Sequence, residues 1–156
     1  MASSVEEGTD QFRERKKCDN QLVKTLKDRN IDVCIIQEPT AREGKILGLG
    51  NRLKPFHGKA ENPRAAISVC KAGIKAILLE DISNKYLTVI EATATNNKSY
   101  VISAYIPPKE NPHFNFGEFI DDLETIIRQL AVKGEIIIGV DANAKSPVWG
   151  SPIEDR

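Results

Sequence analysis

Two segments of the chain, residues 19–29 and 116–132, carry apolar side chains three or four positions apart. This is the spacing of a helix with one buried face. Asp19 is placed to cap the start of the first helix, and Asn115 with Glu118 forms a capping box at the start of the second. The apolar stripes comprise Leu22, Val23 and Leu26 in the first helix, and Phe119, Leu123, Ile126, Ile127 and Leu130 in the second.

Six other segments are rich in apolar and β-branched residues and are separated by turn residues, which predicts strands. Because strands and helices alternate, we expect an α/β fold with one mixed sheet. Each helix has a single apolar stripe, so we expect both helices to cover one face of that sheet. The segment between Pro39 and Pro63 holds four glycines and predicts a long loop with a short strand near Ile46. The predicted strands are 32–37, 65–70, 74–80, 86–95, 99–106 and 135–140.

Composition limits the organisation and the partners of the chain. A length of 156 residues allows one domain with a sizeable core. Residues 1–17 are polar and predict a frayed or disordered segment, so the folded domain is expected to span 18–156. Lys and Arg number 22, as do Asp and Glu, and the formal net charge is zero. Dedicated nucleic-acid binders carry a basic surplus, so any DNA binding should be weak unless basic residues cluster.

The cysteine pattern and the absence of long apolar segments point to an intracellular protein. Cys18, Cys34 and Cys70 lack metal-site spacing, and an odd number leaves one unpaired in any disulfide scheme. This favours a reducing compartment, nucleus or cytoplasm. No apolar stretch is long enough to span a membrane, and residues 1–17 lack the apolar core of a signal peptide.

Polar side chains stand where three of the predicted strands end. Glu38 follows strand 32–37, Tyr105 lies at the end of another strand, and Asp141 with Asn143 follows a third. Asp141 and Asn143 are two positions apart and project to the same side, where their oxygens suit a hard cation and a phosphate. The same pair also fits a simple Asx turn that ends a strand, and this segment alone does not separate the two interpretations. Tyr105 equally fits a half-buried aromatic residue whose hydroxyl finds a partner.

Three motifs in order resemble the exonuclease–endonuclease–phosphatase superfamily. They are IIQEP at 35–39, SAYIPP at 103–108 and GVDANAKSPVWGS at 139–151. Residues 62–67 (NPRAAI) and 145–150 (KSPVWG) are similar to the apurinic-endonuclease-like domain of jockey-type non-LTR retrotransposons. The resemblance implies that the chain is the first half of a four-layer α/β sandwich.

The resemblance also implies a function, hydrolysis of DNA phosphodiesters with Mg²⁺, or Mn²⁺ in its place, as in the nicking of a retrotransposon target site. Glu38 would be the metal carboxylate, Tyr105 would lie near the phosphate, and Asp141 and Asn143 would orient water and a phosphate oxygen. The family's Asn ligand on an earlier strand and its later Ser-Asp-His segment have no counterpart in this sequence. We therefore expect an incomplete domain with weak nicking or none.

Two other functions remain open from the sequence. One is a catalytically dead remnant that binds a protein partner or self-associates through a sheet face left uncovered by the missing half. The other is a phosphoester phosphatase related to the same superfamily. Residues 62–67 and 142–150 fit the retrotransposon branch better than the phosphatases, which makes the phosphatase the less favoured alternative.

Overall fold

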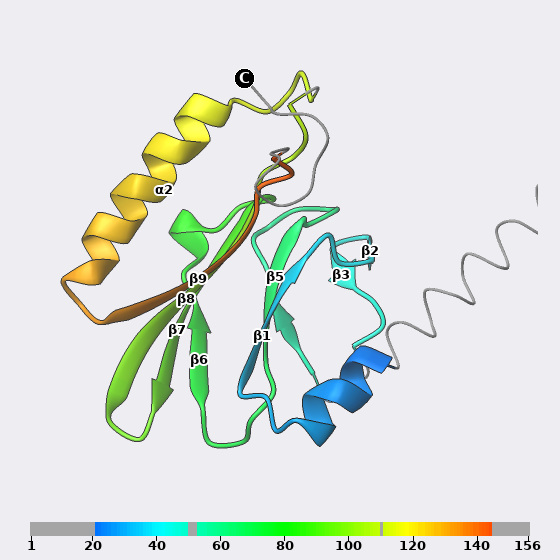
Figure 1. Ribbon diagram of the computed structural model, residues 1–156, viewed down its shortest axis with the longest axis vertical. Coiled ribbons are helices and arrows are strands. Elements are labelled where there is room, and N and C mark those ends of the chain that lie inside the picture. The colour runs from blue at the N-terminus through cyan, green and yellow to red at the C-terminus, as the bar shows by residue number, and fades with distance from the viewer. Residues whose placement is uncertain (1–20, 50–52, 110, 145–156) are drawn as a thin grey trace, which may run out of the picture.

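The structure is a computed structural model that describes residues 21–49, 53–109 and 111–144 (Figure 1). The predicted segment 1–17 and the cap Asp19 lie outside the described residues, as does the motif beyond residue 144. Residues 21–28 are helical. No helix in the described part is long and apolar enough to cross a membrane. The remaining elements are β1 (Val33–Gln37), β2 (Ala41–Arg42), β3 (Lys45–Ile46), β4 (Pro55–Phe56), β5 (Ala65–Val69), β6 (Lys75–Leu78), the 3-10 helix η1 (Glu80–Ile82), β7 (Leu87–Ala94), β8 (Asn97–Tyr105), α2 (Phe116–Ala131) and β9 (Glu135–Asp141).

The strands form two main sheets and a small hairpin. The larger sheet has the order β6-β7-β8-β9, and its first three strands are antiparallel neighbours. Strand β9 runs parallel to β8, because α2 carries the chain back between them. The second sheet has the antiparallel order β1-β5-β4, and β2 pairs with β3. The α/β class with a mixed sheet is therefore confirmed.

The two sheets pack face to face through an apolar cluster. Ile67 of β5 is fully buried there against Ile90 and Val101 of the larger sheet, with Ile35 and Phe56 at its margin. The other face of the larger sheet is covered by α2, whose apolar stripe packs on β7 and β8. Figure 1 shows α2 and the helical residues 21–28 on opposite sides of the paired sheets.

This arrangement corrects the expectation of one sheet with both helices on the same face. Residues 65–68 of β5 are buried on both faces, so β5 needs a cover on each side. An apolar run of this kind fits the centre of either sheet, and the sequence pattern does not select the partner strands. Pairing with β1 and β4 places β5 opposite the larger sheet, which becomes the cover of its inner face.

Helix α2 begins where the capping box predicts. The Asn115 side chain accepts a hydrogen bond from the Glu118 amide at 3.2 Å, and the helix ends at Ala131, one residue before the predicted end. Glu124 and Arg128 pair one turn apart on its exposed face. The buried face of the helix comprises Phe119, Leu123, Ile126 and Leu130.

Side-chain hydrogen bonds join the sheets at one end of the sandwich. Ser103 Oγ of β8 donates to the Ile36 carbonyl of β1 at 3.1 Å, and Thr88 Oγ1 of β7 donates to the Ala65 carbonyl of β5 at 2.9 Å. Gln37 Nε2 of β1 donates to the Gly139 carbonyl of β9 at 3.3 Å. These bonds fix how one sheet sits on the other where β1, β8 and β9 end.

Ser68 and Ser103 are both fully buried, yet only one uses its hydroxyl. Among the described residues Ser68 Oγ has no hydrogen-bond partner, whereas Ser103 Oγ bonds across the sheets. We expect Ser68→Ala to raise the free energy of unfolding by about 1 kcal/mol and Ser103→Ala to lower it by about 1 kcal/mol. Urea denaturation of the two variants measures both changes, and equal destabilisation would contradict the expectation.

Candidate functional site

Three strand ends meet where the sheets are hydrogen-bonded together. Glu38 follows β1, and its Oε1 accepts a hydrogen bond from the Tyr105 hydroxyl at the end of β8, at 2.8 Å. Tyr105 pairs in register with Asp141, the last residue of β9. Asn143 follows two residues later, and its Nδ2 donates to the Ile106 carbonyl at 3.0 Å. The structure thus brings the four sequence-predicted site residues to the same end of the sandwich.

Glu38 has an unusual backbone conformation for a non-glycine residue. Its φ is +48°, in the left-handed region, which costs on the order of 1 kcal/mol. The Glu38 amide donates to the Arg64 carbonyl at 2.8 Å, which holds the chain in this conformation. The carboxylate stays half exposed, so a ligand can reach it from solvent.

Asp141 and Asn143 form an Asx turn at the end of β9, which is the structural alternative that the sequence offers for this segment. The backbone amide of Asn143 donates to Asp141 Oδ1 at 3.1 Å. Asn143 has a φ of +46°, a left-handed conformation that asparagine adopts more readily than most residues. The turn also places the Asn143 side chain against β8. Asp141 and Asn143 therefore form a structural turn and also lie close to Tyr105. Their catalytic roles stay predictions.

The pKa of the Tyr105 phenol lies above its ordinary value. Burial of the ring is the main cause, and the hydrogen bond to Glu38 and the charge of that carboxylate raise the pKa further. A hydrogen bond with Asn143 and the charge of Arg64 act in the opposite direction. The phenol consequently keeps its proton through neutral pH and remains the donor to Glu38.

Arg64 is a site residue that the sequence interpretation missed. Its Nη1 donates to Glu38 Oε1 at 3.3 Å, and both side chains are about half exposed. An ion pair at this exposure contributes about 0–1 kcal/mol to stability, so it does little for the fold. Arg64 immediately precedes the fully buried part of β5, just as Glu38 immediately follows β1, which is the signal that could have found it.

The donors at this end suit a metal that keeps most of its water. Within the described ranges, no group of three or more His, Cys, Asp or Glu side chains is placed to hold a metal ion. Magnesium is commonly bound by one or two carboxylates and retains several waters. Glu38, whose carboxylate is half exposed, is a residue at this end that could hold such an ion.

Comparison with known proteins bears on the fold around this site. Residues 99–156 match a family model described as endonuclease-reverse transcriptase. No curated protein matches the chain by sequence. The endonuclease domain of TRAS1, a telomere-specific non-LTR retrotransposon, superposes with a TM-score of 0.69 at 22% identity, over 88% of this chain and 58% of that one. The chain therefore has the fold of this endonuclease domain.

Two further solved structures share this fold. TDP2 from D. rerio, complexed with a single-stranded DNA product, has a TM-score of 0.56 at 16% identity, over 86% of this chain and 58% of that one. An endonuclease/exonuclease/phosphatase family protein from Leptotrichia buccalis has a TM-score of 0.54 at 12% identity, over 88% of this chain and 63% of that one. The chain thus spans less than two thirds of the length of each of these structures.

Proposed function

We propose that this chain carries part of the active site of a divalent-metal-dependent DNA endonuclease, within one domain spanning residues 18–156. The observation that carries the proposal is the Tyr105–Glu38 hydrogen bond at the strand end that also holds Asp141 and Asn143. The likeness to a retrotransposon endonuclease domain supports DNA as the substrate. A nuclear or cytoplasmic location is proposed with it.

Glu38 is the proposed ligand of Mg²⁺ or Mn²⁺. Such an ion, when bound, neutralises phosphate charge and lowers the pKa of a water molecule. Tyr105 keeps the Glu38 carboxylate in place by donating a hydrogen bond to Oε1. Asn143 is held by its bond to the Ile106 carbonyl, so its amide group is fixed next to Tyr105 and can orient a phosphate oxygen. Asp141, at the end of β9, is the proposed acceptor that orients the attacking water.

We propose that the activity of this chain alone is low. A well-placed general base contributes about 100- to 10,000-fold in rate. Asp141 is the sole candidate base among the described site residues, and its Oδ1 is already engaged by the Asn143 amide. The net charge of zero also limits non-specific attraction to DNA.

A remnant that binds a protein partner or a second copy is the other candidate. In the part of the chain that the structure describes, β9 is an edge strand of the larger sheet, and its side chains Ile137, Ile138 and Val140 are each at least 40% exposed. An exposed apolar edge strand favours association with another chain. This reading requires no catalysis by Glu38, so a nicking assay separates it from the nuclease.

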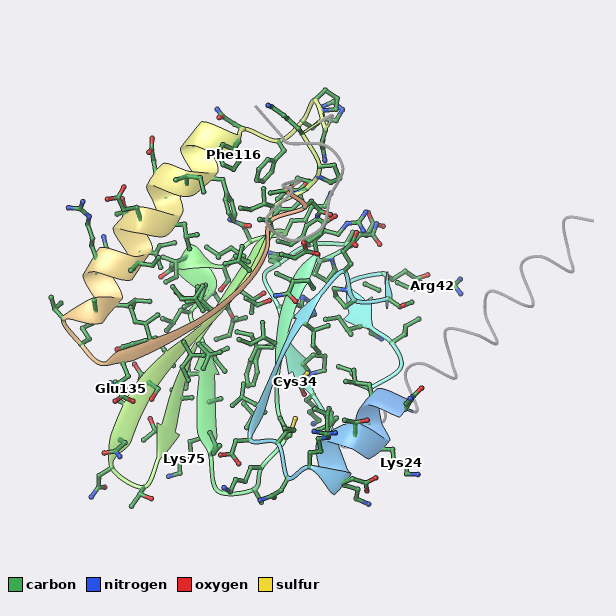
Figure 2. The ribbon with its side chains drawn as sticks, viewed as in Figure 1. Lys24, Cys34, Arg42, Lys75, Phe116 and Glu135 are labelled. Carbon is green, nitrogen blue, oxygen red and sulfur yellow. The ribbon has the colours of Figure 1, made fainter. Side chains whose placement is uncertain are left out.

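The test is nicking of supercoiled plasmid in Mg²⁺ by the wild-type chain, Glu38→Gln and Asp141→Ala at equal concentration, with Lys75→Ala as control. We expect slow nicking by the wild type and the control, and a rate about 100-fold lower in Glu38→Gln and Asp141→Ala. Lys75 begins β6, at the opposite end of the sandwich from Phe116 (Figure 2). Equal background in all four proteins would refute the nuclease and favour the partner-binding remnant.

A further inference from the structure

A hollow of about 500 Å³ lies beside Glu38, on the side of Arg64 and Lys85. Its charged lining residues are Glu38, Arg64 and Lys85, which leave one net positive charge (two cations minus one anion) in a chain whose total charge is zero. Asn62 and Thr40 add polar groups to the wall. The hollow is therefore a local cluster of basic residues, where a chain of zero net charge can attract a DNA phosphate.

The backbone fixes where the two cations stand. The Arg64 amide donates to the Lys85 carbonyl at 2.7 Å, and the Arg64 carbonyl accepts from the Glu38 amide at 2.8 Å. Lys85 sits in a turn closed by Asn84, whose side chain accepts hydrogen bonds from the amides of Tyr86 and Leu87. Backbone hydrogen bonds thus hold the three segments that carry Glu38, Arg64 and Lys85 next to one another.

Arg64 has donors beyond the one that it gives to Glu38. A guanidinium carries five N–H groups in a planar fork, which suits the oxygens of a phosphate. Only Nη1 is used in the bond to Glu38, at 3.3 Å, which is long for a charge-assisted bond. With nearly half of its side chain exposed, Arg64 can contact Glu38 and a ligand in the hollow at the same time.

We propose that Arg64 and Lys85 form a phosphate-binding subsite that holds a backbone phosphodiester group of the DNA strand beside Glu38. The proposal rests on the proposed function, because it takes DNA as the substrate. Arg64 is the principal donor, and Lys85 supplies the second positive charge. The subsite positions the strand and takes no part in bond breaking, so Arg64 and Lys85 are positioning residues.

The test measures binding of a short fluorescein-labelled DNA duplex by anisotropy, in EDTA and over a series of salt concentrations. We expect Arg64→Ala to weaken binding about tenfold, as loss of one charge-assisted contact does, and to reduce the salt slope by about one. Lys85→Ala should weaken binding about threefold, by loss of an exposed charge. Arg64→Lys should fall between Arg64→Ala and the wild type, and Lys75→Ala should match the wild type. Thermal melting checks that each variant is folded.

A Glu38→Gln background distinguishes a phosphate contact from a mere counter-ion. If Arg64 only neutralises Glu38, Arg64→Ala should cost no affinity once Glu38 is glutamine. We expect the loss to persist in that background. Unchanged affinity and salt slope in Arg64→Ala, or no DNA binding by the wild type, would overturn the proposal.

The binding assay in EDTA does not depend on cleavage. Absent nicking with binding that still depends on Arg64 would defeat the proposed nuclease function and leave the subsite standing. Nicking that depends on Glu38 with binding indifferent to Arg64 would defeat the subsite alone.

Discussion

Replacement of Gly58 by alanine is expected to lower the free energy of unfolding by about 3 kcal/mol, the upper part of the range for overpacked sites. A Cβ at this position would lie 2.2 Å from the carbonyl oxygen of Asn84 and 2.4 Å from its nitrogen. Both contacts are with backbone, which cannot move aside as a flexible side chain does. The Asn84 amide is also tied to the Leu87 carbonyl at 2.7 Å, so the turn resists displacement. The melting temperature should fall by roughly 6–12 °C.

Gly117→Ala is the matched control for this substitution. A Cβ there meets only the Asn115 side chain, at the ordinary contact distance of 3.7 Å, and the residue lies in the first turn of α2. Alanine in a helix is favoured over glycine by about 0.5–1 kcal/mol, so the control should be unchanged or slightly more stable. Equal melting temperatures for Gly58→Ala and the wild type would mean that Gly58 and the turn at Asn84 are not packed as described.

Ile67→Ala is expected to lower the free energy of unfolding by about 3 kcal/mol, within the range for large-to-small changes in a core. Ile67 is fully buried at the centre of β5, between Ile35 of β1 and Phe56 of β4, and it faces the larger sheet. Truncation leaves a cavity between two sheets whose spacing is fixed by hydrogen bonds at one end, so collapse around it is limited.

Ile77→Ala provides the comparison for the same chemical change on the surface. Ile77 lies on the edge strand β6 and is 64% exposed, so its truncation should change the free energy of unfolding by less than about 0.5 kcal/mol. Guanidinium denaturation of both variants measures the difference. A similar loss in the two would show that the sheets do not enclose Ile67.

Local signals in the sequence predict the elements well because they act over a few residues. The capping box at Asn115 sets the start of α2, and the helical spacing that begins at Phe119 identifies its buried face. The short strand expected near Ile46 forms as β3, paired with β2. Apolar runs ended by turn residues likewise predict the strands from β5 to β9 closely.

The assignment of strands to sheets could not be read from the same signals. β1 and β5 are apolar on both faces, so nothing local distinguishes membership of one large sheet from membership of a second sheet laid over it. The decision comes from pairing between residues far apart, such as Ile35 with Ile67. Periodicity fixes which residues are buried, and tertiary contacts fix what buries them.

The sequence predicts the polar residues at the strand ends of the site, but it does not predict the ion pair between Arg64 and Glu38. Glu38, Tyr105 and Asp141 each follow or end an apolar run, which predicts a common edge. Arg64 stands before its strand, and it reaches the same edge only because β5 runs antiparallel to β1. That direction depends on the sheet pairing, which the sequence pattern does not supply.

The position of β9 bears on when the site forms during folding and on how easily it opens. Asp141 ends a strand at the edge of its sheet, and the contact from Gln37 to Gly139 joins residues 102 positions apart. Closing so long a stretch of chain costs entropy that only native packing repays, so contacts of this range form late. Among the described strands, β9 is hydrogen-bonded to β8 alone, and an element with few such bonds opens more readily when a native protein fluctuates. Partial unfolding that starts at β9 would therefore take the site apart while the centre of the sandwich stays intact.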